Sequence, residues 1–176
     1  VWAEDELAYT IIFKNSVNGN TQIQSTTKSS TVIAANCTTF VASQPFSNIS
    51  KAYYGDNKTS IRIGTSSDPG TLDIALSNNG QVKATKVVVN CYLYNSGKPA
   101  TLSLNGKTAQ SIPTSAGDLT FDINADITSL SIAISKYAFV NTISVYKESA
   151  PSTFTVTCEV NEETPWGTLS STDPIS

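Results

Sequence analysis

The stretch that decides the fold runs from Lys86 to Tyr94 and reads Lys-Val-Val-Val-Asn-Cys-Tyr-Leu-Tyr. Apolar side chains occupy every second position, and polar or aromatic ones occupy the positions between them. This two-residue period is that of a β-strand buried on one face, because a helix would need apolar residues every three or four positions. The apolar set is Val87, Val89, Cys91 and Leu93, and the outward set includes Asn90, Tyr92 and Tyr94.

A hairpin is predicted shortly after this strand. Leu102 and Leu104 continue the alternation, and Asn105-Gly106 follows at once. This dipeptide is a strong hairpin signal, since both central residues of a type I′ turn need a positive φ. Residues 107–112 are the predicted partner of the strand that the turn closes.

The same alternation recurs along most of the chain, and turn-forming residues separate the segments. Leu72, Ile74 and Leu76 are predicted to point inward, and so are Phe139, Ile143 and Val145 in the last strand of the module. Short strands are expected at 9–13, 21–25, 31–35, 61–63, 72–76, 119–123, 130–134 and 139–145, and a long loop at 36–57. About ten or eleven short strands with no helical period predict an all-β protein, an antiparallel β-sandwich of the jelly-roll type.

The domain organisation follows from shifts in composition. Val1–Ala3 is interpreted as the end of a secretory signal, because a small-x-small pattern precedes an acidic start. Residues 4–147 are expected to form the β-sandwich module, and 148–152 a linker with Pro151. Residues 153–176 contain one further alternating segment and are interpreted either as the start of a second β-module or as a tail.

Composition excludes some classes of partner. Charged residues make up 14% of the 176-residue chain, the net charge is −3, and Arg62 is the only arginine. Nucleic-acid binding needs clustered lysine and arginine, so it is not expected. No apolar run reaches the roughly 18 residues of a membrane span. The hydroxyl-rich surface indicates an exported protein, extracellular or at the cell surface, with the periplasm as an alternative.

Catalytic and metal-binding motifs are not found. The chain has no histidine, so the usual base of a nucleophilic triad is missing. The three cysteines show no metal-ligand spacing. Cys91 is expected to be a buried thiol, and a Cys37–Cys91 disulfide is left open. Asp118, Asp122 and Asp126 cluster in sequence but without a calcium-loop pattern, so a structural calcium ion is left open without named ligands. No enzymatic activity is predicted.

Several motifs together resemble a known family. The chain is similar to a β-sandwich module of secreted and surface proteins of the Bacteroidetes, and the resemblance covers residues 9–147. It implies a jelly roll related to galactose-binding-like domains and no settled activity. A second resemblance, to the opening of internalin-type B repeats, begins at Phe154. The motifs are Ala52-Tyr-Tyr-Gly, Ile61-Arg-Ile-Gly-Thr-Ser-Ser, Lys86-Val-Val-Val-Asn, Leu102-Ser-Leu-Asn-Gly and Ile143-Ser-Val-Tyr in the first module, and Phe154-Thr-Val-Thr in the second.

A set of aromatic and polar residues forms the predicted ligand site. Aromatic rings offer flat apolar faces to a sugar ring, and amide or cationic groups bind its edge. Tyr53 and Tyr54 are adjacent, so at most one of them can point inward from an extended chain. The candidates are Tyr53, Tyr54, Arg62, Asn90, Tyr92 and Tyr94.

Two functions follow from these observations. The first is a non-catalytic module that binds a glycan or a surface polysaccharide, or that mediates adhesion. The second is a structural spacer that presents downstream modules of the same polypeptide. A contiguous exposed patch with two or more aromatic rings would favour the first function.

Overall fold

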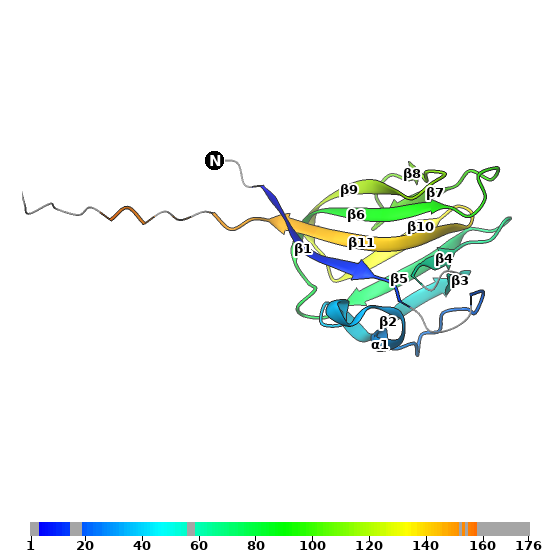
Figure 1. Ribbon diagram of the computed structural model, residues 1–176, viewed down its shortest axis with the longest axis horizontal. Coiled ribbons are helices and arrows are strands. Elements are labelled where there is room, and N and C mark those ends of the chain that lie inside the picture. Colours follow the sequence, from blue (N-terminus) through cyan, green and yellow to red (C-terminus); the bar gives the residue numbers. More distant parts are fainter. Residues whose placement is uncertain (1–3, 15–18, 56–58, 152, 154, 158–176) are drawn as a thin grey trace, which may run out of the picture.

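The computed structural model describes residues 4–14, 19–55, 59–151, 153 and 155–157, and eleven strands in two antiparallel sheets account for most of them (Figure 1). The predicted fold class, an all-β antiparallel sandwich, is confirmed. The elements are β1 (Asp5–Ile12), α1 (Ser29–Val32), the 3-10 helix η1 (Ala35–Cys37), β2 (Val41–Ser50), β3 (Ala52–Tyr54), β4 (Ile61–Ile63), β5 (Gly70–Leu76), β6 (Lys83–Leu93), β7 (Thr101–Leu104), β8 (Gln110–Ser111), β9 (Gly117–Asp126), β10 (Ser129–Ile134) and β11 (Ala138–Glu148).

The larger sheet has six strands, and β11 is its centre. The strand order is β3-β4-β11-β6-β9, and β1 pairs with the same edge of β11 as β4 does, further along the strand. The second sheet has the order β2-β5-β10-β7-β8. From β4 onward the chain crosses repeatedly between the two sheets, so nearly every strand is flanked by strands distant in sequence. This connectivity is typical of a jelly roll.

The core lies between the two sheets, and alternation along the strands creates it. In β6, the predicted inward residues Val87, Val89 and Cys91 have no exposed surface, and the residues between them are only half-buried. β5 and β10 alternate in the same way from the opposite sheet, through Leu72, Ile74, Leu130 and their neighbours. Apolar burial of this kind is the main stabilising contribution to the sandwich.

The Asn105-Gly106 turn is confirmed. Both residues have a positive φ, +47° and +72°, as a type I′ turn requires, and the turn joins β7 to β8. β8 is shorter than the predicted partner strand. β6 and β7 carry one continuous alternation in the sequence, yet they belong to different sheets.

The long loop predicted for 36–57 is wrong. β2 and β3 lie within it, after η1 and a turn at 38–40. β2 is an edge strand whose pairing with β5 shifts register twice, between Val41 and Phe46 and between Ser47 and Ser50. Irregular pairing breaks the two-residue period, and an edge position tolerates Pro45, so the usual sequence signals of a strand are missing.

Two further segments that were predicted as strands form only isolated bridges in the structure. Residues 21–25 contribute one isolated bridge, from Gln22 to Tyr53, and 31–35 holds the end of the four-residue helix α1 and a bridge from Ile33 to Phe13. Both segments are too short to build a ladder.

Cys37 and Cys91 are buried free thiols, so the disulfide left open by the sequence does not form in this structure. The Cys37 thiol donates a hydrogen bond to the carbonyl of Thr10. Burial raises the pKa of both thiols, and that of Cys91 to about 12. Cys158 lies outside the described residues.

The predicted second module also lies mostly outside the described residues, as does Val1–Ala3. β11 ends at Glu148, and the amide of Ser149 donates to the carbonyl of Glu4. Beyond Pro151 only Thr153 and residues 155–157 are described, and they are exposed. The interpretation of 153–176 as a second module or a tail therefore stays a prediction.

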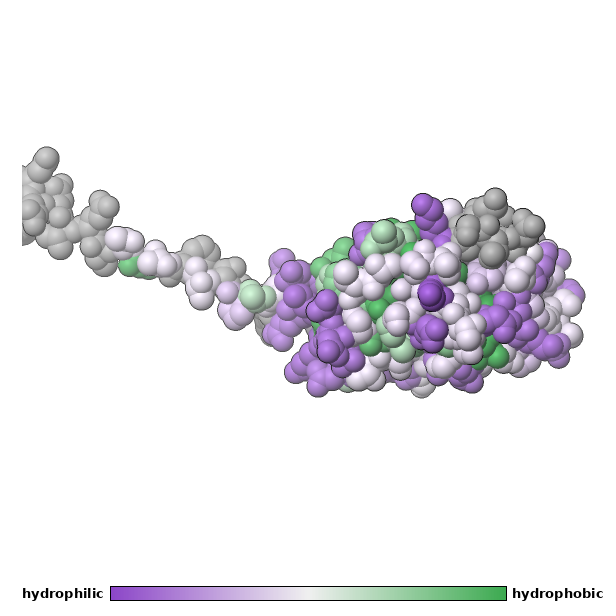
Figure 2. Space-filling view, turned by 90° about the horizontal axis from the view of Figure 1, so that it is seen from below, coloured by the Kyte–Doolittle hydropathy of each residue, from purple (hydrophilic) through white to green (hydrophobic). Residues whose placement is uncertain are grey.

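Within the described ranges, no helix is long and apolar enough to cross a membrane. Figure 2 shows the side of the sandwich that carries α1 and β2, where hydrophilic and intermediate residues dominate and apolar ones are scattered among them. This agrees with the hydroxyl-rich surface expected from composition.

Candidate functional site: an aromatic platform on the larger sheet

A row of side chains crosses four neighbouring strands on the outer face of the larger sheet. Tyr53 of β3 is the direct partner of Arg62 of β4, Arg62 is the partner of Phe139 of β11, and Phe139 is the partner of Tyr92 of β6. Residues paired in this way point to the same face of a sheet. The strand register therefore assembles one row from four segments that are far apart in the sequence.

Ring contacts extend this row to two further tyrosines. The rings of Tyr92 and Phe139 stack with centroids 4.9 Å apart, and those of Tyr94 and Tyr137 with centroids 4.1 Å apart. Tyr94 also stacks on Phe139 at 5.4 Å. Such offset pairs hold their rings in fixed orientations. We call these residues the aromatic platform: Tyr53, Arg62, Tyr92, Tyr94, Tyr137 and Phe139.

Arg62 lies among the tyrosines of the platform. Its guanidinium carbon is 4.5 Å from the ring centroid of Tyr53 and 5.8 Å from those of Tyr94 and Tyr137. These distances are typical of cation–π contacts. The platform is therefore aromatic and cationic at once.

Exposure differs across the platform. Tyr94 is 41% exposed and Phe139 only 8%, so Phe139 forms the floor on which Tyr94 and Tyr92 rest. Tyr53, Arg62 and Tyr137 are half-buried. Tyr94 is therefore the platform side chain most accessible to a ligand.

A chain of polar side chains borders the platform. The side-chain amide of Asn141 donates to the side-chain oxygen of Asn90 at 2.9 Å, and the amide of Asn90 donates to the carboxylate of Asp118 at 2.7 Å. Asn90 is two residues before Tyr92 on β6, which places it on the same face in the next row. We call Asn90, Asp118 and Asn141 the polar rim.

The structure brings together five of the six predicted site residues. Tyr53, Arg62, Tyr92 and Tyr94 belong to the platform, and Asn90 belongs to the rim. Tyr54 lies apart from the other five residues. Its side chain points to the opposite face of β3, is 7% exposed, and has its hydroxyl 3.3 Å from the hydroxyl of Thr27.

Phe139 and Tyr137 were missed by the sequence argument. Phe139 was predicted to point into the core with Ile143 and Val145. A bulge between Val140 and Thr142 inserts one extra residue, which reverses the alternation on the N-terminal side of it. Phe139 is therefore buried, but by the outer-face rings of Tyr92 and Tyr94.

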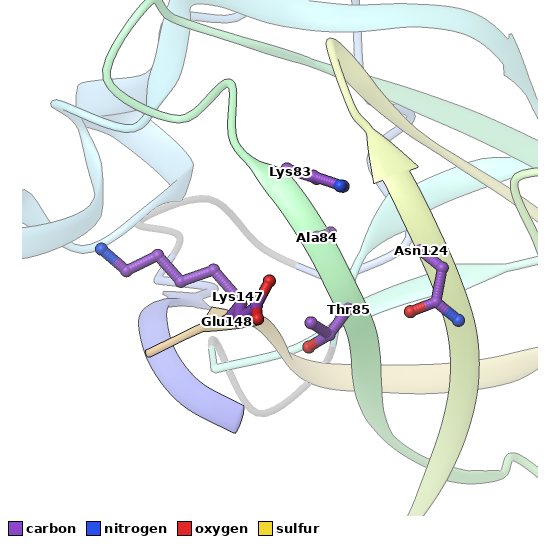
Figure 3. Close-up of a pocket in the computed structure, with 6 residues that line it drawn as sticks. All are labelled: Lys83, Ala84, Thr85, Asn124, Lys147 and Glu148. Atoms are coloured by element: carbon purple, nitrogen blue, oxygen red, sulfur yellow. The ribbon is translucent and has the colours of Figure 1, made fainter. Parts of the chain in front are cut away.

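An open pocket of about 440 Å³ lies at the other end of β6 and β11. The strand register shifts here twice, between Tyr146 and Lys147 of β11 and between Ala84 and Lys86 of β6, and Asn124 has a φ of +51°. Figure 3 shows that the Lys147 side chain extends away from Thr85 and Asn124, so the polar groups do not converge on one point. Its lining residues are Lys83, Ala84, Thr85, Asn124, Lys147 and Glu148.

The described part of the chain contains no cluster of three or more acidic, cysteine or histidine side chains that could hold a metal ion. Asp118 and Asp122 lie on β9 opposite Asn90 and Lys86, facing solvent. The structural calcium ion left open by the sequence thus gains no set of ligands here.

Comparisons with known proteins give no family. No family model matches the chain, and no curated protein matches it. The resemblances to the Bacteroidetes module and to internalin-type repeats therefore stay predictions.

Among solved structures, the chain is similar to a family two carbohydrate esterase from Cellvibrio japonicus, with 13% identity over 65% of this chain and 35% of that chain and a TM-score of 0.37. It is also similar to an exo-β-1,3-galactanase from Phanerochaete chrysosporium in complex with β-1,3-galactotriose, with 12% identity over 83% of this chain and 29% of that chain and a TM-score of 0.35. The chain thus spans about a third of the length of these proteins. Similarity this weak supports no functional assignment.

Proposed function

We propose that the protein is a non-catalytic module that binds a glycan on the aromatic platform, as a secreted or surface-exposed protein. One observation carries the proposal: five aromatic rings and one guanidinium are assembled on the outer face of the larger sheet, from β3, β4, β6 and β11 and from the residues directly after β6 and before β11. Aromatic residues usually lie in the core of a sandwich, and an outward cluster of this size is the kind of surface that marks a binding site.

The chemistry of the surface suits a sugar. The C–H faces of a pyranose ring pack on the faces of aromatic side chains, and its hydroxyls need hydrogen-bond partners at the ring edge. Tyr94 is the most exposed residue of the platform, and the polar rim supplies amide and carboxylate groups at its border. Asn90 and Asn141 can each donate and accept, as sugar hydroxyls do.

The experiment is a glycan array probed with the full chain and with two variants. Tyr94→Ala removes the most exposed platform ring. Tyr146→Ala is the matched control, since Tyr146 is a half-buried tyrosine of β11 near the opposite end of that strand, beside Lys86. We expect binding to one class of glycan, at least about tenfold weaker binding by Tyr94→Ala, and unchanged binding by Tyr146→Ala.

Two results would overturn the proposal. Folded wild-type protein that binds no glycan would favour the structural spacer. Equal loss of binding in both tyrosine variants would place the binding surface elsewhere.

A further inference from the structure

Arg62 lacks the partners that a half-buried arginine normally has. The Asp5–Lys86 pair is the ion pair found among the described residues, and no carboxylate there pairs with Arg62. The Nε of Arg62 is buried and has no hydrogen-bond partner in the described part of the chain. The single arginine of this sequence therefore lies in the aromatic platform with at least one N–H donor that has no acceptor among the described residues.

The surrounding rings compensate for only part of this. A ring face attracts the positive charge of the guanidinium, and Tyr53 does so from 4.5 Å. The N–H groups lie in the plane of the guanidinium, and they need acceptor oxygens rather than ring faces. The buried Nε shows that this part of the protein gives the guanidinium no acceptor, so a ligand that brings acceptor oxygens to the remaining N–H groups forms hydrogen bonds that the described residues do not supply.

A carboxylate is the group that best matches this donor set. Its two oxygens are coplanar and accept two parallel hydrogen bonds from a guanidinium, and the opposite charges strengthen both. Because the guanidinium carbon lies 5.8 Å from the Tyr94 ring centroid, a sugar stacked on Tyr94 can direct an exocyclic group toward Arg62. In a hexuronic acid that exocyclic group is a carboxylate.

We propose that the glycan bound by the platform is acidic, with the carboxylate of a uronic acid held by Arg62. This rests on the proposed function, since it assigns the class of sugar that the same surface takes. The net charge of the chain is −3, and the carboxylate of Asp118 lies in the polar rim. The overall charge of the protein therefore does not attract anions, and a preference for acidic over neutral glycans needs a local cation. The preference is assigned to Arg62, the cation that contacts the platform rings.

The test uses an array on which each uronic acid oligosaccharide is printed beside its methyl-esterified form, together with sulfated and neutral glycans. Five proteins are compared: wild type, Arg62→Gln, Arg62→Lys, Lys86→Gln and Tyr94→Ala. Lys86 is the matched control because it is a cation on the same face of the same sheet, 4.9 Å from the Tyr146 ring. Thermal unfolding of each protein confirms that it is folded.

We expect wild type to bind uronic acid glycans and to lose about tenfold or more of its affinity when the carboxylates are esterified. Arg62→Gln should lose affinity for the acid form by a similar factor, so that it no longer distinguishes the acid from the ester. Lys86→Gln should bind as wild type does. An Arg62→Lys variant, which keeps the charge but not the paired donors, should fall between wild type and Arg62→Gln.

The failure of this inference differs from that of the proposed function. Binding to neutral glycans that Tyr94→Ala weakens and Arg62→Gln does not would overturn the inference and support the platform as a sugar site. Binding confined to sulfated glycans would overturn the carboxylate assignment. Binding to no glycan at all would overturn both.

Discussion

The guanidinium carbon of Arg62 lies 4.5 Å from the ring centroid of Tyr53, its direct partner across β3 and β4. Tyr54, the next residue, points to the opposite face and is buried. The two adjacent tyrosines therefore lie in different environments: Tyr53 is part of the platform, and Tyr54 is part of the core.

This difference predicts unequal effects on stability. Tyr54→Ala should lower the free energy of unfolding by about 3–5 kcal/mol, because it leaves a cavity in the core. Tyr53→Ala should lower it by about 1 kcal/mol, mostly through the lost contact with Arg62. Urea unfolding of both variants measures the two values. Equal losses would contradict the placement of the two rings.

The buried thiols predict slow chemical labelling. In a Cys158→Ser variant, which limits the experiment to Cys37 and Cys91, a thiol reagent at neutral pH should react at least about 100-fold more slowly with the native protein than with the urea-unfolded protein. Two thiols should be counted after unfolding. Rapid labelling of one thiol in the native state would show that its site opens readily.

The same thiols predict a loss of stability at alkaline pH. Burial, and then the charge of Asp118, raise the pKa of Cys91 to about 12. A thiol with a raised pKa stabilises the fold fully below the pKa of the unfolded state, near 8.5, and this stability is lost as the pH rises toward the folded-state value. The contribution of Cys91 to the slope should be at most about 1.4 kcal/mol per pH unit.

Measurement of unfolding free energy from pH 8 to 11 checks this, with Cys91→Ala as the comparison. That variant should be less stable at neutral pH by about 1 kcal/mol, because it leaves a small cavity. Its stability should fall less steeply with pH than that of wild type. Some slope should persist, because burial also raises the pKa values of Tyr9 and Cys37. Parallel curves would contradict the burial of the Cys91 thiol.

Two glycines predict contrasting costs of an added methyl group. A Cβ at Gly80 would lie 1.9 Å from the carbonyl oxygen of Phe40, so Gly80→Ala needs the backbone to move. At Gly106 nothing lies within 4 Å of the added atom, but φ is +72°. Gly106→Ala should cost about 1 kcal/mol, which corresponds to about 2–4 °C in melting temperature.

Gly80→Ala should cost at least about 2 kcal/mol more than Gly106→Ala, because overpacking adds to any backbone effect. The hydroxyl of Tyr9 donates to the Gly80 carbonyl at 2.6 Å, so a shift of this backbone also disturbs a buried hydrogen bond. Thermal unfolding of both variants decides the order. A smaller effect at Gly80 would contradict the close approach to Phe40.

The fold class could be predicted because alternation in a regular strand is local. From Val87 to Leu93 in β6 each inward residue follows from its neighbours two positions away, and the Asn105-Gly106 turn needs only its own backbone angles. The failures occur where pairing is irregular. β2 shifts register against β5, and the bulge in β11 reverses the side on which Phe139 lies.

The candidate site could be predicted residue by residue but not as an assembly. Alternation predicts that the side chains of Tyr92 and Tyr94 point away from the core. It also predicts that one of the adjacent residues Tyr53 and Tyr54 points away from the core. It does not indicate that β4 and β6 lie on either side of β11, which is what brings Arg62 close to Tyr94. Tyr137, in the turn before β11, shows no sequence period that could have placed it beside Tyr94.

The pairing of Asp5 with Glu148 places the start of β1 and the end of β11 side by side, whereas Phe139 lies nine residues back along β11, about 30 Å away. Figure 1 shows both strand ends leaving from the same pole of the sandwich. A molecule tethered to a sensor chip at the start of β1 or at the end of β11 would therefore expose the opposite pole to the bulk solution. The rings of Tyr94 and Tyr137 would then face away from the support. The affinity measured for a ligand of the platform should therefore be the same for both points of attachment.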